Sequence, residues 1–273
     1  MWERVREIWL RFSRARVGTH ASSIAFYFFL STVPLIIVYA CLVPGRTISA
    51  QDMVTFLSGI VPDALSGFMA SMVTQAYAKS GVALSLSIVV LLWTVAQSAQ
   101  ALRRGLNAVY EVKENRNAAT AIGVSVLFIV VLLIALSMVM YLIFSGGVIS
   151  AIVGIIAAEE TQATVTALLE SLAMLAIGVL VFAACYTYLA AGSRPFRAQL
   201  PGAVLVSVVW YVFSFALRWF LCHFNRFTLF YGSLAMPVLF VFWLYCIFYI
   251  LLAGGFINHV CANWIERKLC VRS

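Results

Sequence analysis

The sequence predicts an all-α membrane protein with six transmembrane helices, from its composition and from its long apolar runs. Hydrophobic residues make up 64% of the 273 residues and charged residues only 10%, whereas charged residues form about a quarter of a typical soluble domain. Six continuous apolar segments are close to or above the roughly 20 residues that a helix needs to cross the hydrocarbon core. None shows the alternation of a membrane β-strand. The predicted spans are 21–43, 81–102, 121–144, 165–190, 203–222 and 234–257.

The distribution of basic residues predicts how these spans are oriented. Fourteen of the 18 Lys and Arg residues precede span one or follow spans two, four and six, and the other four lie at the opposite span ends. Because basic residues are retained on the cytoplasmic side of a membrane, we expect both termini in the cytoplasm, with 258–273 as a cytoplasmic tail. The net charge of +8 thus reflects membrane topology, and no nucleic-acid partner is expected.

The first segment, 1–17, predicts an amphipathic helix on the cytoplasmic surface. Its apolar residues follow helical spacing with arginines between them: Trp2, Val5, Ile8, Trp9 and Phe12. Such a helix lies in the plane of an anionic leaflet, where each basic residue contributes about 1 kcal/mol to binding. Membrane lipids with anionic head groups are therefore the expected partners.

The first external connection, 44–80, is too long for a simple turn. Met53, Phe56, Leu57 and Ile60 follow the i, i+3, i+4, i+7 pattern of a helix, and a second such series follows Pro62. We expect two amphipathic helices here that form a cap on the external face.

No catalytic or cofactor-binding pattern is visible. The ten acidic residues and three histidines are scattered, and no P-loop, dinucleotide fingerprint, hydrolase motif or metal-ligand spacing occurs. We therefore expect no metal, no cofactor and no enzymatic activity. Most of the six cysteines lie in apolar runs and are interpreted as small apolar residues. A disulfide between Cys41 and Cys222, near the same membrane face, is left open.

Polar residues at membrane depth give a first candidate site near the external ends of spans four and five. Such residues are costly in a bilayer and indicate function where several converge. A pair between a carboxylate and a guanidinium of adjacent helices would offset the desolvation of both. The alternative is that these side chains extend to the interface or tie two helices together. The candidates are Glu170, Arg218, His223, Asn225 and Arg226.

A second candidate site, for lipid head groups or for the entrance of an anionic solute, lies at the cytoplasmic span ends. The general enrichment of basic residues on the cytoplasmic side of membranes explains its arginines equally well. Its members are His20, Gln97, Gln100, Arg103, Arg104, Asn107, Arg194 and Arg197. Asn258 and His259 end span six at the same level, and Pro34 and Pro237 are expected to kink their helices.

Three segments resemble the YihY / virulence factor BrkB family of bacterial inner-membrane proteins, once labelled ribonuclease BN. They are ASSIAFYFFLSTVPLI at 21–36, LRRGLNAVYEV at 102–112 and the run from LPGA to GGFIN at 200–258. The resemblance implies six spans in the cytoplasmic membrane and roles in envelope integrity, resistance to host killing and export of lipids or solutes. Where the family usually has Gly-Ala-Glu-Leu-Asn, this chain has Phe256 in place of the acidic residue, which puts any role of that residue in doubt here.

The sequence and the resemblance together favour a permease or exporter of a lipid or another envelope component. A non-transporting structural or interaction protein is the alternative. A membrane-bound ribonuclease is a third hypothesis, disfavoured because no catalytic cluster is present. Whether the protein forms a homo-oligomer is left open.

Overall fold

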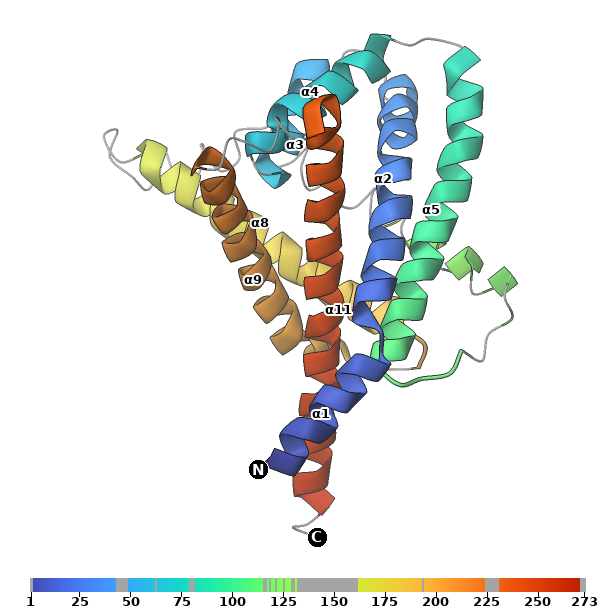
Figure 1. Ribbon diagram of the computed structural model, residues 1–273, viewed down its shortest axis with the longest axis vertical. Helices are drawn as coiled ribbons and strands as arrows, with labels where there is room; N and C mark the ends of the chain where they lie inside the picture. The colour runs from blue at the N-terminus through green and yellow to red at the C-terminus, as the bar shows by residue number, and fades with distance from the viewer. Residues whose placement is uncertain are drawn as a thin grey trace.

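The computed structural model has helices and no β-strands in the residues that it describes, which confirms the predicted all-α fold class (Figure 1). These residues are 2–42, 49–61, 63–78, 82–114, 117, 119–120, 122–124, 126–128, 131, 162–192, 194–223 and 231–270. The α-helices are α1 (Trp2–Arg14), α2 (Val17–Leu42), α3 (Ala50–Ile60), α4 (Asp63–Ala78), α5 (Val82–Val109), α8 (Gln162–Ala184), α9 (Phe196–His223) and α11 (Ala235–Cys270). A π-helical turn, η1 (Cys185–Leu189), follows α8, and a 3₁₀ turn, η2 (Gly232–Leu234), precedes α11.

Five helices of the described chain are long and apolar enough to cross a membrane. They correspond to five of the six predicted spans, and most of the sixth, 121–144, lies outside the described residues. The helices are longer than the apolar runs: α5 continues past residue 102 to Val109, α9 begins at Phe196, and α11 runs without a break to Cys270. A helix can extend beyond the hydrocarbon core, because its polar side chains there contact water while its backbone hydrogen bonds stay intact.

The helices form two groups that meet at α11. Helices α2 and α5 pack together on one side of α11. Helix α9 packs on the other side, and α8 packs against α9. Helix α1 and the last turns of α11 lie at one end of the molecule, hereafter the α1 end, and α3 and α4 lie across the opposite end (Figure 1). Helices α8 and α9 converge with the other spans near the α1 end and diverge from α2 and α5 toward α3 and α4 (Figure 1).

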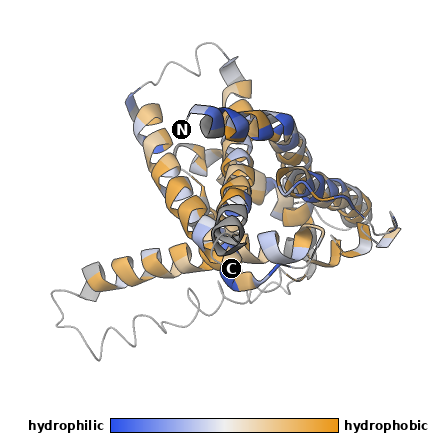
Figure 2. Cartoon of the chain, turned by 90° about the horizontal axis from the view of Figure 1, so that it is seen from below, coloured by the Kyte–Doolittle hydropathy of each residue, from blue (hydrophilic) through white to orange (hydrophobic). Residues whose placement is uncertain are grey.

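Large apolar side chains cover the outside of the spans. Leu172, Val212 and Phe215 of α8 and α9 are 60%, 59% and 68% exposed, and hydrophobic residues dominate these helices along their length (Figure 2). Soluble proteins rarely expose so much contiguous apolar surface, so these faces contact lipid. The chain is a membrane protein.

Helix α1 is amphipathic, as the sequence predicts, and is fixed to α11 by aromatic contacts. The Phe12 ring lies 5.2 Å from the Phe256 ring and 6.2 Å from the Tyr249 ring, both in edge-on arrangements. Arg16, with φ of 46°, bends the chain between α1 and α2, so that α1 leaves the line of the span (Figure 1). Phe256 thus forms part of the surface that holds α1.

Two helices form in the segment between the first two spans, where the periodicity predicts them. Ser49 and Asp52 cap the start of α3 reciprocally, because each side chain accepts a hydrogen bond from the backbone N–H of the other. The apolar faces of α3 and α4 bury Met53 and Val73 against Ile36 and Ile37 of α2. These helices close one end of the bundle by hydrophobic packing.

The two predicted kinks differ in position. Pro34 lies inside α2, where it lacks the N–H that would donate to the Leu30 carbonyl. Pro237 is the third residue of α11, and a first-turn proline leaves no helical hydrogen bond unmade. Pro237 therefore starts a helix and requires no kink.

Helices α9 and α11 approach most closely at two glycines. A Cβ atom on Gly254 would lie 2.0 Å from Cγ2 of Val206 and 2.9 Å from the Tyr186 hydroxyl. A Cβ atom on Gly202 would lie 2.4 Å from Oδ1 of Asn258. Small residues let membrane helices approach through their backbones, and here they allow polar side chains to reach across.

Replacing Gly254 with alanine should destabilise the protein by about 1–3 kcal/mol, because the new methyl group overpacks the α9–α11 contact. Thermal unfolding in detergent, followed by circular dichroism, measures this. Val206→Ala in the same chain should restore part of the loss. The control is Gly67→Ala on an exposed face of α4, where an added Cβ meets nothing within 4 Å. It should be neutral or stabilising by up to about 1 kcal/mol. Equal melting temperatures for the Gly254→Ala and wild-type proteins would contradict the packing argument.

Candidate functional site

Four buried polar side chains gather at the α1 end of the bundle. Two come from α5, one from α9 and one from α11, and each is less than 9% exposed: Arg103, Asn107, Gln199 and Asn258. Buried polar groups destabilise a structure unless hydrogen bonds replace the lost contacts with water. Their partners therefore define what this region does.

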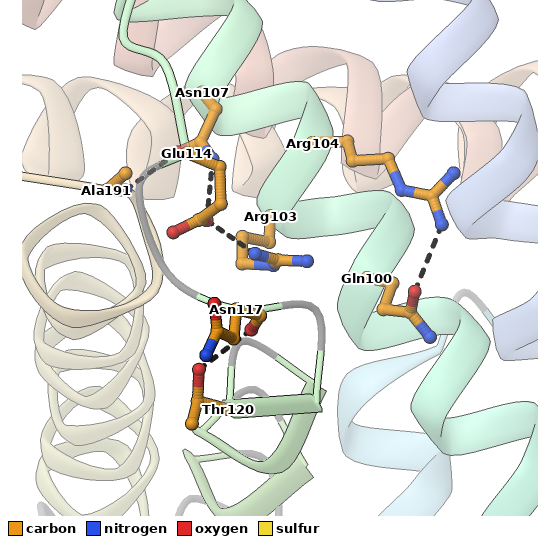
Figure 3. A network of polar contacts seen from close by, with 8 residues as sticks. All are labelled: Gln100, Arg103, Arg104, Asn107, Glu114, Asn117, Thr120 and Ala191. Carbon is orange, nitrogen blue, oxygen red and sulfur yellow. Dashed lines mark hydrogen bonds and ion pairs between the residues drawn. The ribbon is translucent and has the colours of Figure 1, made fainter.

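Asn107 joins α5 to the turn that follows η1. Its Oδ1 accepts a hydrogen bond of 2.7 Å from the Ala191 N–H, and its Nδ2 donates to Glu114 Oε2 at 3.1 Å. The same Glu114 oxygen forms an ion pair with Nη1 of Arg103 (Figure 3). One amide and one carboxylate thus connect α5, the segment after it and the η1–α9 turn.

Asn258 joins α11 to α9 in a similar way. Its Oδ1 accepts a 2.8 Å hydrogen bond from the Gly202 N–H, and its Nδ2 donates to the backbone and side-chain oxygens of Gln199 at 3.1 and 3.2 Å. The Tyr110 hydroxyl donates to Gln199 Oε1 at 2.7 Å. Gln199 therefore receives donors from both α11 and the end of α5.

Tyr110 lies at the centre of this arrangement. The guanidinium carbon of Arg194 is 3.9 Å from the centroid of its ring, within the range of a cation–π interaction. Arg194 Nη1 also donates to the Ala191 carbonyl at 3.0 Å. Burial raises the pKa of Tyr110 to about 12 in spite of this nearby cation, and burial lowers the pKa of Arg194. Tyr110 is a neutral hydrogen-bond donor at physiological pH.

Glu111 holds an unusual backbone conformation at the end of α5. Its φ of 54° is the left-handed geometry that glycine normally supplies after a helix. The Val112 N–H donates to the Asn107 carbonyl and the Glu111 N–H to the Ala108 carbonyl, which completes a Schellman cap. The Glu111 carboxylate then lies 3.9 Å from His259 Nε2 and 4.0 Å from Arg11 Nη1. The cap places a carboxylate between α1 and α11.

The structure divides the second predicted site into two hydrogen-bonded groups on α5. Arg103 and Asn107 belong to the buried network, and Arg194 joins it through Ala191. Gln100 and Arg104 point the other way, toward α2, and Arg104 Nη2 donates to Gln100 Oε1 at 3.1 Å (Figure 3). The remaining members, His20 beside Arg104, half-buried Gln97 and exposed Arg197, lie outside the network.

The first predicted site is described only in part. The Glu170 side chain and the whole of Asn225 and Arg226 lie outside the described residues, as do the side chains of Cys41 and Cys222. Arg218 and His223 are exposed near the end of α9. The His223 ring contacts its own helix, with Nδ1 2.8 Å from the Trp219 carbonyl oxygen. The pairing of Glu170 with Arg218 stays a prediction.

Sequence reasoning missed three members of the network, Tyr110, Glu114 and Gln199. Glu114 follows Asn107 by seven residues, which would place both on one helix face, but the helix ends at Val109 and the contact depends on the turn. Gln199 lies in a polar segment before Pro201 that gives no sign of burial. Among the described residues, no three His, Cys, Asp or Glu side chains are grouped so that they could hold a metal ion.

Substituting Asn107 with alanine should lower the free energy of unfolding by about 1–3 kcal/mol, because the buried Ala191 N–H loses its acceptor. Asn117→Ala is the matched control, since Asn117 is exposed and contributes only its backbone carbonyl to Thr120. Denaturation in detergent measures both. Equal losses for the two variants would show that the network contributes nothing specific.

The raised pKa of Tyr110 predicts a pH dependence. A tyrosine whose pKa rises from 10.0 to about 12 on folding contributes stability that is fully present below pH 10 and is lost as pH rises through about 12. The difference in tyrosinate absorbance between wild type and Tyr110→Phe should therefore have its midpoint near pH 12. A midpoint near pH 10 would mean that Tyr110 is open to water.

Comparison with known proteins places the chain in a family. Residues 8–269 match the family described as Virulence factor BrkB. A Bacillus subtilis protein described as ribonuclease-like, YfkH, is 24% identical over 93% of this chain and 93% of its own length. A UPF0761 membrane protein of Methylibium petroleiphilum is 26% identical over 90% of this chain and 59% of its own length. No solved structure matches significantly. The match across nearly the whole length shows that the chain belongs to the virulence factor BrkB family of membrane proteins.

Proposed function

We propose that this protein is a permease or exporter that moves a lipid or another amphipathic envelope component across the bacterial inner membrane. The α1 end faces the cytoplasm. Helix α1, the arginines at the end of α5 and the arginines before α9 all lie at this end, and basic residues concentrate on the cytoplasmic side.

The observation that supports transport is the contrast between the two ends of the bundle. At the α1 end, buried hydrogen bonds tie α5, α9 and α11 together. Toward α3 and α4, the α8–α9 pair diverges from α2 and α5 (Figure 1). The apolar packing of α3 and α4 against α2 closes that end. A permease alternates which end is closed, and hydrogen bonds that can be exchanged for water suit a closure that opens.

Arg103 supplies a second argument. It is 7% exposed, and its Nε has no hydrogen-bond partner in the part of the chain that the structure describes. A guanidinium held within the bundle with one donor unsatisfied is costly, and charged groups in such positions usually serve a path for a polar substrate. Loss of this charge should affect transport more than it affects the fold.

The competing hypothesis is a non-transporting protein that supports envelope machinery. One observation favours it: nearly every polar group of the network bonds to another group of the same chain, as a purely structural tie would. The ribonuclease-like description belongs to the Bacillus subtilis relative, which is 24% identical to this chain.

A lipid scramblase-type assay tests the proposal. Purified protein in proteoliposomes should make fluorescent phospholipid on the inner leaflet accessible to an external quencher faster than empty vesicles do. Arg103→Gln should change this rate by roughly tenfold, as expected when a charge-assisted contact is lost. Lys113→Gln, which removes an exposed charge near the same end, should leave the rate unchanged. Glu170→Ala and Arg218→Ala test the first predicted site in the same assay.

Two outcomes would count against transport. A rate equal to that of empty vesicles, for several head groups, would reject the permease. A partner protein that co-purifies at a fixed ratio, with no flux in its presence or absence, would favour the interaction protein instead.

A further inference from the structure

Helix α5 carries a polar stripe beside Arg103 and Asn107, within its transmembrane segment. Gln97, Gln100 and Arg104 are spaced i, i+3 and i+7, and Trp93 continues the same face one turn further in. All four lie in the apolar segment Leu86–Val109 that is long enough to span the membrane. Two amides and a guanidinium on one face of a span are costly without a ligand or partner.

Helix α2 runs alongside this stripe and contacts α5 above and below it. At the α1 end, a Cβ atom on Gly105 would lie 3.1 Å from Cβ of His20, so the histidine is directly beside Arg104. Further in, the Tyr27 and Trp93 rings meet edge to face at 6.1 Å. The polar side chains of α5 therefore lie along its contact with α2, between His20 at one end and the Tyr27–Trp93 pair at the other.

Arg104 supplies a positive charge that no described carboxylate balances. It is exposed, and it forms none of the ion pairs that join the other arginines of this region to glutamates. Among the described residues, the Arg104 side chain bonds to Gln100, from Nη2 to Oε1. This bond orients the guanidinium and leaves its other N–H groups to donate to a ligand. A guanidinium presented in this way suits the paired oxygens of a phosphate.

The side chains along this face change from charged to polar to apolar with depth, in the same order as the phosphate, ester and acyl groups of a phospholipid. Gln100 and Gln97 lie about 6 and 10 Å inward from Arg104 along the helix axis, at a level where amides can donate to ester carbonyls. Beyond them, Trp93, Val89 and Leu86 are 55%, 65% and 69% exposed and offer apolar surface to an acyl chain.

We propose that the face formed by His20, Trp93, Gln97, Gln100 and Arg104 binds one anionic phospholipid, with its phosphate on Arg104 and its chains along α5. The site deepens the proposed function, because it names the class of lipid that the protein recognises. Among the described residues its side chains form no hydrogen bond with the buried network, so the two can be tested separately.

Lipid binding to the intact protein in detergent, measured by native mass spectrometry, tests the site. Phosphatidylglycerol and phosphatidylcholine are titrated in parallel. Wild type should bind one phosphatidylglycerol molecule in clear preference, and Arg104→Gln should weaken that binding about tenfold, as expected for loss of a charge-assisted phosphate contact. Gln100→Leu should weaken it less, because it removes the group that orients Arg104. Lys113→Gln, which removes an exposed charge from the same end, should stay within about twofold of wild type.

Three results would overturn the proposal. The first is equal binding of the two lipids, and the second is an equal effect of Arg104→Gln and Lys113→Gln, which would indicate general attraction to a basic surface. The third is full displacement of the lipid by millimolar inorganic phosphate, which would indicate a site for the free anion. Binding is measured without translocation, so specific binding with no flux would reject the permease and leave the lipid site in place.

Discussion

The hydrogen bonds of two buried amides, Asn107 and Asn258, hold the rest of the structure in register. In a bilayer the hydrophobic effect gives little reason for helices to associate, because lipid tails are as apolar as leucine. Polar contacts and close backbone approach must specify the arrangement instead. Each amide accepts a hydrogen bond from a backbone N–H of another segment, Ala191 or Gly202. Each of these bonds forms only when the two segments have one particular relative position. The glycines at the α9–α11 crossing make that position reachable.

Much of the fold could be predicted from the sequence, because the thickness of the membrane sets the length of the apolar helices that cross it. Apolar runs located five spans, and helical periodicity located α1, α3 and α4. The ends of α5, α9 and α11 could not be predicted so well, since a helix extends beyond the hydrocarbon for reasons of backbone geometry. The left-handed Glu111 that ends α5 carries no recognisable signal, because glycine is the residue expected there.

The candidate sites were harder to predict, and for a physical reason. Grouping residues by membrane level put Arg103 and Arg104 into one set, although consecutive residues on a helix point about 100° apart. That rotation sends one guanidinium into a hydrogen-bonded network and leaves the other at the surface of the bundle. Tyr110 and Gln199 belong to the network through a contact between segments 89 residues apart, which no local pattern records.

The central position of α11 has a mechanical consequence. This helix contacts both the α2–α5 pair and α9, so any relative displacement of the two groups must occur by sliding along one of its faces. On the α9 side that face includes Gly254, which has no side chain to change rotamer or to catch on its neighbour. The hydrogen bonds of Asn258 to Gly202 and Gln199 fix the resting position of α9 on this face. Any sliding of α9 along α11 would have to break those bonds and also move the buried side chains that pack beside them, such as Val206 and Leu252.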